Sequence, residues 1–376
     1  MRAFAMRAAV LAAVCALATA APPAPSAGWM LGPFVRSPLN PILAPDPAVR
    51  FAPAAGVRPV RWEALHVFNP AAIVRDGNVV LLFRAEDDSG SEAIGGHVSR
   101  IGLAMSADGV RFRRRGRPVL YPGDDAQQAN EAGGGCEDPR VVEAPDGTYV
   151  MTYTQWNRRL ARLAVATSRD LVHWRKHGPA FAKLGGAWAG RWSKSGAIVT
   201  ALVHGRLEAV KIHGRYWMYW GDQGVRIASS ANLLDWAPGP VVLPPRRGRF
   251  DSALTEAGPP AVRTRRGIVL LFNAMNAAAG GAMNAAAGGD PALPPGRYTA
   301  GQALFAADAP DRLLARSARP FFEPQARYET GGQYAAGTTF LEGLVWFHRA
   351  WFLYYGAADS RIAVAAWRPP ASWPAR

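Results

Sequence analysis

Short apolar runs follow tight turns at several places along the chain. Val79 to Phe83 comes after Asp76-Gly77, and Tyr149 to Tyr153 comes after Asp146-Gly147. Three further runs of this kind are Tyr216 to Trp220, Ile268 to Phe272 and Trp351 to Tyr355. Asp-Gly between apolar runs is typical of a hairpin turn, and Val, Tyr, Phe and Trp favour the half-buried surface of a sheet. The pattern therefore predicts a series of antiparallel hairpins.

A second unit follows each of these runs. It consists of an apolar strand, a turn that contains Ser and Asp or Asn, and then an aromatic residue. Clear copies begin at Ile101, Leu163 and Ile227, and weaker copies begin at Ala303 and Ile362. Repeats of about 60 residues that each supply three or four antiparallel strands are typical of a propeller. The sequence predicts an all-β fold, a five-bladed β-propeller, because a pair of β-sandwiches would not explain two strand types repeated in a fixed order.

One interval between copies is longer than the others. Residues Ala274 to Gly289 contain the octad Ala-Met-Asn-Ala-Ala-Ala-Gly-Gly written twice in succession. Removing all 16 residues of the two copies restores the usual spacing, and we expect the second copy, as a duplication, to lie in a loop.

The first residues have the pattern of a signal peptide. A basic start is followed by the apolar run Ala8 to Ala18, which ends in small residues. We expect residues 1–20 to be removed, residues 21–38 to form an N-terminal extension, and residues 39–376 to form a single propeller domain that carries the activity. The mature protein would then begin near Ala21 and be secreted or periplasmic, which N-terminal sequencing of the natural protein tests. No apolar run is long enough to predict a membrane span.

Composition excludes several classes of function. The formal net charge is +15, but no aromatic and basic platform accompanies the densest basic run, Arg111 to Arg117, so we expect no nucleic-acid partner. Only Cys136 remains after cleavage, so no disulfide within the mature chain is possible. The histidines are scattered without the spacing of metal ligands, and we expect neither a metal nor another cofactor.

Polar residues stand at the start of the predicted innermost strand of four repeats. If the repeats are equivalent, Asn69, Asp138, Lys194 and Glu256 approach one another at one end of the central channel. Two carboxylates, a cation and an amide are the parts of a sugar-processing site, because glycoside cleavage needs one acid for the leaving oxygen and one base for water. Each charged residue could instead form an ion pair that only orders the rim.

Five motifs spaced like the blades carry a resemblance to a known family. They are Phe68-Asn-Pro70, Leu82-Phe-Arg-Ala-Glu-Asp87, Glu137-Asp-Pro-Arg140, Ala257-Gly-Pro-Pro260 and Tyr355-Gly-Ala-Ala-Asp359. Together they resemble glycoside hydrolase family 130, over about residues 39–367. The family contains inverting mannoside phosphorylases and a smaller set of β-1,2-mannosidases.

The resemblance implies roles for several residues. Asp138 matches the general acid, which is thought to act through the 3-hydroxyl of the sugar. The residues that match those holding the mannosyl ring are Asn69, Arg84, Asp87 and Asp359. We add Arg140 of the third motif to the candidate substrate-binding residues.

The departures from the phosphorylase pattern favour hydrolysis. Phosphorylases usually carry Tyr-His-Gly where this chain has Phe272-Asn273-Ala274, and their histidine helps to bind phosphate. Glu256 and Asp222 resemble the acidic residues that would activate water in the hydrolase branch, and either could be the base. Arg162 and Lys194 stand where phosphorylases keep phosphate-binding cations, although both could instead pair with those two carboxylates.

We therefore expect a secreted, inverting exo-β-mannosidase that hydrolyses β-1,2-linked mannosides in the central funnel. Its partner would be a mannoside oligosaccharide or glycan. A β-mannoside phosphorylase that releases mannose 1-phosphate is the first alternative, and only this alternative needs inorganic phosphate. A propeller that binds sugar without cleaving it is the second.

Overall fold

A computed structural model describes residues 28–53, 58–91, 93–278 and 288–370. The expected signal peptide, residues 1–20, lies outside the described residues. In the described part of the chain, no helix is both long and apolar enough to span a membrane.

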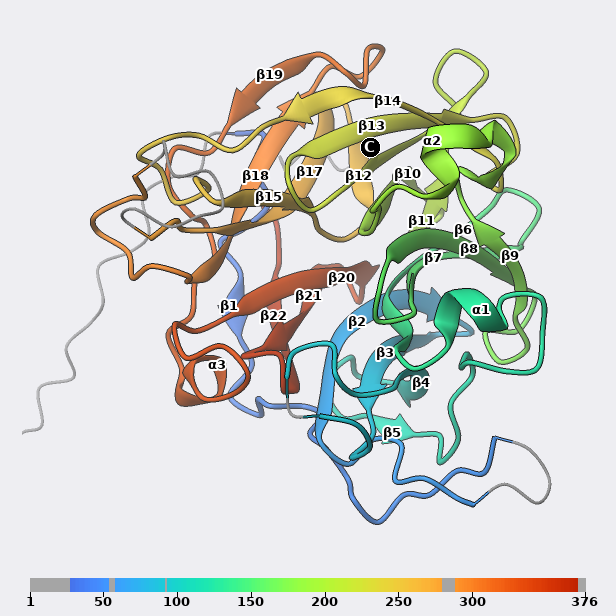
Figure 1. Ribbon diagram of the computed structural model, residues 1–376. Coiled ribbons are helices and arrows are strands. Elements are labelled where there is room, and N and C mark those ends of the chain that lie inside the picture. The colour runs from blue at the N-terminus through green and yellow to red at the C-terminus, as the bar shows by residue number, and fades with distance from the viewer. Residues whose placement is uncertain (1–27, 54–57, 92, 279–287, 371–376) are drawn as a thin grey trace, which may run out of the picture.

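The protein is a five-bladed β-propeller, and Figure 1 shows the blades following one another in chain order. The first blade contains β2 (His66–Arg75), β3 (Asn78–Glu86), β4 (Ser99–Ser106) and β5 (Arg113–Arg114). The second contains β6 (Gly135–Glu143), β7 (Tyr149–Trp156), β8 (Ala161–Ser168) and β9 (Arg175–Pro179). The third contains β10 (Gly196–Val203), β12 (Tyr216–Trp220), β13 (Val225–Ser230) and β14 (Trp236–Leu243).

The inner strand of the fourth blade is divided in two. This blade contains β15 (Leu254–Ala257), β16 (Ala261–Thr264), β17 (Gly267–Met275), β18 (Tyr298–Phe305) and β19 (Leu313–Arg316). The fifth contains β20 (Thr339–Phe347), β21 (Ala350–Ala357) and β22 (Arg361–Trp367). The helical segments are short: α1 (Gln128–Glu131), η1 (Ala182–Leu184), α2 (Gly186–Ala189) and α3 (Arg327–Thr330).

The N-terminal segment closes the ring. Strand β1 (Val35–Arg36) pairs antiparallel with β22, so the first described strand forms the outer edge of the last blade, and the two lie side by side in Figure 1. The Arg36 guanidinium is 2.7 Å from Glu329 Oε1 and also donates to the Glu323 carbonyl. Part of the segment expected as an extension, residues 21–38, is therefore built into the fifth blade.

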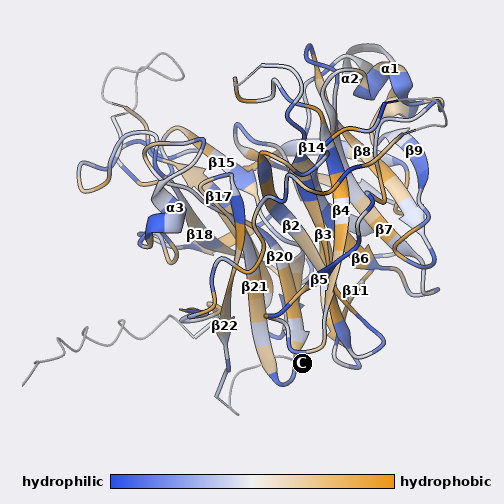
Figure 2. Ribbon diagram, turned by 90° about the horizontal axis from the view of Figure 1, so that it is seen from below, coloured by the Kyte–Doolittle hydropathy of each residue, from blue (hydrophilic) through white to orange (hydrophobic). Residues whose placement is uncertain are grey.

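Apolar side chains are buried between neighbouring blades. The buried residues form clusters that each combine strands of two adjacent blades, such as Tyr219 and Ile227 of the third blade with Phe272 of the fourth. In Figure 2 the hydrophobic colour is concentrated along the strands, whereas α1 and α3 are hydrophilic. The predicted aromatic-rich runs are the second strands of the blades, which are buried on both faces and therefore lack strict alternation.

The repeated Ser-x-Asp sequence has a structural cause. Asp108 Oδ1 accepts hydrogen bonds from the backbone N–H groups of Val110 (2.9 Å) and Arg111 (2.7 Å), while Ser106 Oγ accepts from Gly109. Ser168 with Asp170, and Ser230 with Asn232, build the same turn in the next two blades. Short polar side chains that bond the backbone in this way specify a turn, which is why the residues recur.

Two features did not follow from the repeat. Strand β11 (Arg206–Ala209) extends the inner strand of the third blade into an extra hairpin with β10. The duplicated octad begins inside β17, which ends at Met275, and residues 279–287 of it lie outside the described residues. The side chain of Asn276 ties the base of this loop by donating to the carbonyls of Asp290 and Leu293.

We predict that Asp108→Ala lowers the free energy of unfolding by about 1 kcal/mol, because it removes hydrogen bonds of a partly exposed turn. Asp108→Asn is the matched control and should be close to wild type, since Asn232 performs this role in the third blade. Urea denaturation measures both variants. Equal destabilisation by Ala and Asn would contradict the assignment of the repeat to this turn.

Candidate active site

All five blades contribute to a cavity of about 220 Å³ at one mouth of the channel. Its polar lining residues are Asn69, Arg84, Glu137, Asp138, Lys194, Glu256, Tyr298, Gln333, Tyr334, Thr338 and Asp359. The structure thus brings together the four residues expected to converge, from positions far apart in the chain. The same cavity is lined by the indoles of Trp156 and Trp192.

Bulges in the innermost strands turn two of these side chains toward the axis. The pairing of β2 with β3 shifts at Asn69, and that of β6 with β7 shifts between Glu137 and Arg140. Asn69 and Asp138 take left-handed backbone conformations, with φ of 47° and 48°. Asn and Asp are the non-glycine residues that adopt this conformation most readily, and such strain is often kept at functional sites.

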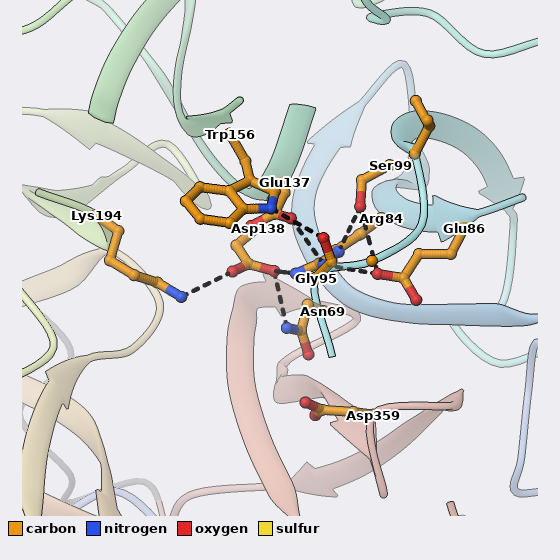
Figure 3. Close-up of polar contacts among 12 residues, drawn as sticks. Asn69, Arg84, Glu86, Gly95, Ser99, Glu137, Asp138, Trp156, Lys194 and Asp359 are labelled. Atoms are coloured by element: carbon orange, nitrogen blue, oxygen red, sulfur yellow. Dashed lines mark hydrogen bonds and ion pairs between the residues drawn. The ribbon is translucent and has the colours of Figure 1, made fainter. Parts of the chain in front are cut away.

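Asp138 is buried at the centre of this site (Figure 3). Its Oδ1 accepts hydrogen bonds from the Asn69 amide (2.9 Å) and from Arg84 Nη1 (3.1 Å), and its Oδ2 lies 3.4 Å from Lys194 Nζ. Burial raises the pKa of Asp138, but the nearby Arg84 and Lys194 cations outweigh it and hold that pKa well below its usual range. The ligand-free site therefore contains Asp138 as a carboxylate.

Arg84 joins three carboxylates. Besides Asp138, its Nη2 lies 2.6 Å from Glu86 Oε1 and 2.9 Å from Glu137 Oε1, and its Nε donates to Ser99 (Figure 3). A guanidinium has five donors in a fixed plane, so most of its capacity is already used. Burial raises the pKa of Glu137 and the opposing effect of Arg84 does not cancel it.

Glu256 is buried and lies near the same Lys194 ammonium as Asp138. Its Oε1 is 3.8 Å from Lys194 Nζ and accepts a hydrogen bond from the Ser195 hydroxyl. Burial raises the pKa of Glu256 to about 7, although Lys194 opposes the change. A carboxylate with this pKa can gain and lose a proton near neutral pH, as a general base must.

Asp359 lines the cavity from the loop between β21 and β22. Its Oδ1 and the Oδ1 of Asn69 are buried and have no hydrogen-bond partner in the protein. Burial, and after it the charge of Asp138, raise the pKa of Asp359 to about 7. Unpaired buried acceptors are costly, so these two oxygens are suited to hydroxyl groups of a ligand.

Several residues expected in the site lie outside the cavity lining. Asp87 is buried, but its carboxylate is 2.7 Å from Arg100 and accepts from Ser89 in the same loop. Arg162 lies in β8, where its Nη1 donates to Asn130 Oδ1 at 3.1 Å. Asp222 is partly exposed at the rim, where it accepts a hydrogen bond from Trp192 Nε1 (2.9 Å).

Arg140 lies beneath the cavity floor, where it joins three blades. It donates to the carbonyls of Asp138, Ala257 and Gly258 and forms an ion pair of 2.9 Å with Glu342. Burial raises the pKa of Glu342 well above its usual value. Asp87, Arg140 and Arg162 are thus not among the residues that line the cavity, and their expected contact with substrate stays a prediction.

The model of the family described as beta-1,4-mannooligosaccharide phosphorylase, glycoside hydrolase family 130, matches residues 36–369. The chain belongs to glycoside hydrolase family 130. It is 29% identical over 307 residues to a 1,2-beta-oligomannan phosphorylase of Thermoanaerobacter sp. (strain X514), which covers 81% of this chain and 90% of that protein.

Two solved structures are more similar in sequence to this chain. One comes from the work on glycoside hydrolases of family 130 that target beta-1,2 mannosidic linkages in Candida mannan; it is 46% identical, has a TM-score of 0.87, and covers 91% of this chain and 95% of that chain. A glycosyl hydrolase from Bacteroides ovatus is 45% identical with a TM-score of 0.87, covering 91% of this chain and 96% of that chain. The chain is thus a family 130 enzyme that acts on mannosides.

The family motifs did not indicate the aromatic walls of the cavity. Trp156 is the last residue of β7, Trp192 lies in the loop before β10, and Tyr298 begins β18. Trp156 could have been predicted from the sequence. It is the last residue of β7, and this end of β7 pairs with the start of β6, the strand that carries Asp138. Trp192 and Tyr334 lie in loops that have no counterpart in the repeat. Among the described residues, no group of three or more His, Cys, Asp or Glu side chains could hold a metal ion.

We predict that Glu256 makes the stability of this family 130 enzyme depend on pH. Because its pKa is raised in the folded protein, the folded state keeps a proton up to about pH 7 that the unfolded chain has already released. Its contribution to the free energy of unfolding is therefore fully present below the ordinary pKa and is lost as the pH rises through about 7.

Thermal midpoints measured between about pH 4 and about pH 8 check this. Glu256→Gln removes the titration of this group and should make the decline less steep, while Asp359 and Glu137, whose pKa values are also raised, keep part of it. Glu323→Gln, outside the cavity lining, is the control and should decline as the wild type does. An unchanged slope in Glu256→Gln would contradict the prediction.

Proposed function

We propose that this protein is an inverting exo-β-mannosidase that hydrolyses β-1,2-linked mannosides. The observation that carries the proposal is the position of Glu256, a buried carboxylate whose pKa is raised to about 7 and which shares the Lys194 ammonium with Asp138. This arrangement supplies a base for water beside the residue that the family uses as its acid. The 46% identity to a structure from work on β-1,2-mannoside hydrolases supports the same assignment.

Glu256 is the proposed base. Water placed between its carboxylate and the anomeric carbon would attack from the face opposite the glycosidic oxygen, and the displaced proton would pass to Glu256. The C1–O bond breaks as the new C1–O bond forms, so the configuration inverts. Ser195 fixes one oxygen of the base by a hydrogen bond, which leaves the other for the water. Asp222 is a poorer candidate because it is partly exposed and its carboxylate is already bonded to Trp192.

Asp138 is the proposed acid, acting through the 3-hydroxyl of the mannosyl group as the family resemblance implies. Its pKa is too low for this role in the ligand-free site. A bound sugar that separates Asp138 from Lys194, 3.4 Å away, would weaken one of the cations that lower this pKa. Substrate binding would thereby bring the acid closer to the protonated form that it needs.

Phosphorolysis is the second candidate. The curated relative from Thermoanaerobacter is named a phosphorylase, and Lys194 is a cation in the cavity. However, Arg84 and Lys194 both pair with carboxylates there. Asn273, at the position of the phosphorylase histidine, is bonded through its amide to the backbone of Leu341. A phosphate dianion beside these acids would be opposed by like charge.

The products distinguish the two candidates. In phosphate-free buffer we expect β-1,2-mannobiose to be cleaved to mannose, with the new anomeric centre first formed as α. Millimolar phosphate should neither accelerate the reaction nor yield mannose 1-phosphate. Glu256→Gln should lower kcat by roughly 10²–10⁴-fold, because an amide cannot accept the proton of water.

Proton NMR of the reaction mixture reports both the anomer and the sugar phosphate. Glu208→Gln on β11, outside the cavity lining, is a suitable control that should keep wild-type activity. Mannose 1-phosphate as the main product, or a Glu256→Gln variant as active as the wild type, would overturn the hydrolase assignment.

A further inference from the structure

Two indoles stand together at the mouth of the cavity. Trp156 and Trp192 pack edge to face, with ring centroids 5.8 Å apart and planes at 69°. Trp192 is 42% exposed, and the neighbouring lining residue Ile94 is 59% exposed. Large apolar side chains left in solvent beside buried carboxylates indicate a surface that a ligand covers.

Both indoles are fixed through their N–H groups. Trp156 Nε1 donates to the Gly95 carbonyl at 3.0 Å (Figure 3), and Trp192 Nε1 donates to Asp222 Oδ2 at 2.9 Å. The polar edge of each ring is therefore satisfied by the protein. The indole surface that faces the cavity is therefore apolar and held in a fixed orientation, and such a surface suits the C–H face of a sugar ring.

The position of the two indoles along the cavity determines which sugar they contact. The unpaired oxygens of Asn69 and Asp359 lie buried with Asp138, at the place proposed for the mannosyl group that is transferred. The exposed indole of Trp192 lies at the mouth, so it can contact only what extends outward from that group. In an exo-acting enzyme this is the sugar that leaves.

We propose that Trp156 and Trp192 form the binding site for the leaving sugar, and that Asp222 is a positioning residue that holds Trp192. This inference rests on the proposed function and deepens it. It gives Asp222 a role other than that of the base. A leaving group without a sugar ring would gain nothing from the indole pair, so the pair contributes to selection for mannosides that carry a second sugar.

The test compares two substrates, β-1,2-mannobiose and β-mannosyl fluoride, since the fluoride has no leaving sugar. For Trp192→Ala and Asp222→Ala, we expect the ratio of kcat/KM on mannobiose to kcat/KM on the fluoride to fall at least tenfold. Asp222→Asn should restore the ratio to within threefold of wild type, because an amide oxygen still accepts from the indole N–H. Leu314→Ala, which removes an exposed apolar side chain from β19, is the matched control and should leave the ratio unchanged.

The remaining outcomes overturn the inference. An equal loss on both substrates in Asp222→Ala and in Asp222→Asn would identify Asp222 as a base. An unchanged ratio in Trp192→Ala would show that the indole pair does not bind the leaving sugar. Failure of the wild-type enzyme to hydrolyse either substrate would instead reject the proposed function, so the two failures are distinguishable.

Discussion

The Asp138 carboxylate is buried where an unpaired charge would be too costly to keep, and the cations of Arg84 and Lys194 compensate it. Each cation also contacts a second carboxylate, Glu137 for Arg84 and Glu256 for Lys194. Removal of either cation would leave a buried carboxylate without a compensating charge. This destabilises a protein more than the replacement of both partners of an ion pair by apolar residues. The proposed acid, the proposed base and the side chains proposed to bind sugar thus depend on one connected set of ion pairs.

The propeller makes this set possible by supplying its members from different blades. Each inner strand reaches the same mouth, and bulges at Asn69 and Asp138 turn side chains toward the axis that a regular strand would direct elsewhere. Arg140 then bonds backbone carbonyls of the second and fourth blades and pairs with Glu342 of the fifth. The bulge that carries Asp138 is therefore held by neighbouring blades as well as by its own strand.

Much of this could be predicted from the sequence, because the repeat has local causes. The Ser106 and Asp108 turn and the aromatic hairpins recur in neighbouring blades, and equivalent inner strands place Asn69, Asp138 and Glu256 at one mouth. What could not be predicted depends on packing between blades and on loops. Arg140 is only two residues from Asp138, but the bulge directs it under the floor.

Asp87 and Trp192 show the same limit of prediction from the sequence. Asp87 was expected to line the cavity and does not, whereas Trp192 was not expected there and does. Asp87 follows a strand that reaches the site, yet donors of its own loop bind its carboxylate. Trp192 belongs to a loop of the third blade without a repeated counterpart, yet it lines the cavity. The partner of a polar group in a loop is set by the path of that loop, which the blade repeat does not specify.

The most direct test of the account is a crystal structure of Asp138→Asn grown with β-1,2-mannobiose and phosphate. The variant lacks the acid, so the substrate should remain intact in the cavity. The account predicts a mannosyl group beside Asn69 and Asp359, and a water molecule bonded to Glu256 on the face of the anomeric carbon opposite the glycosidic oxygen. A phosphate ion held by Lys194 in the place of that water would contradict it.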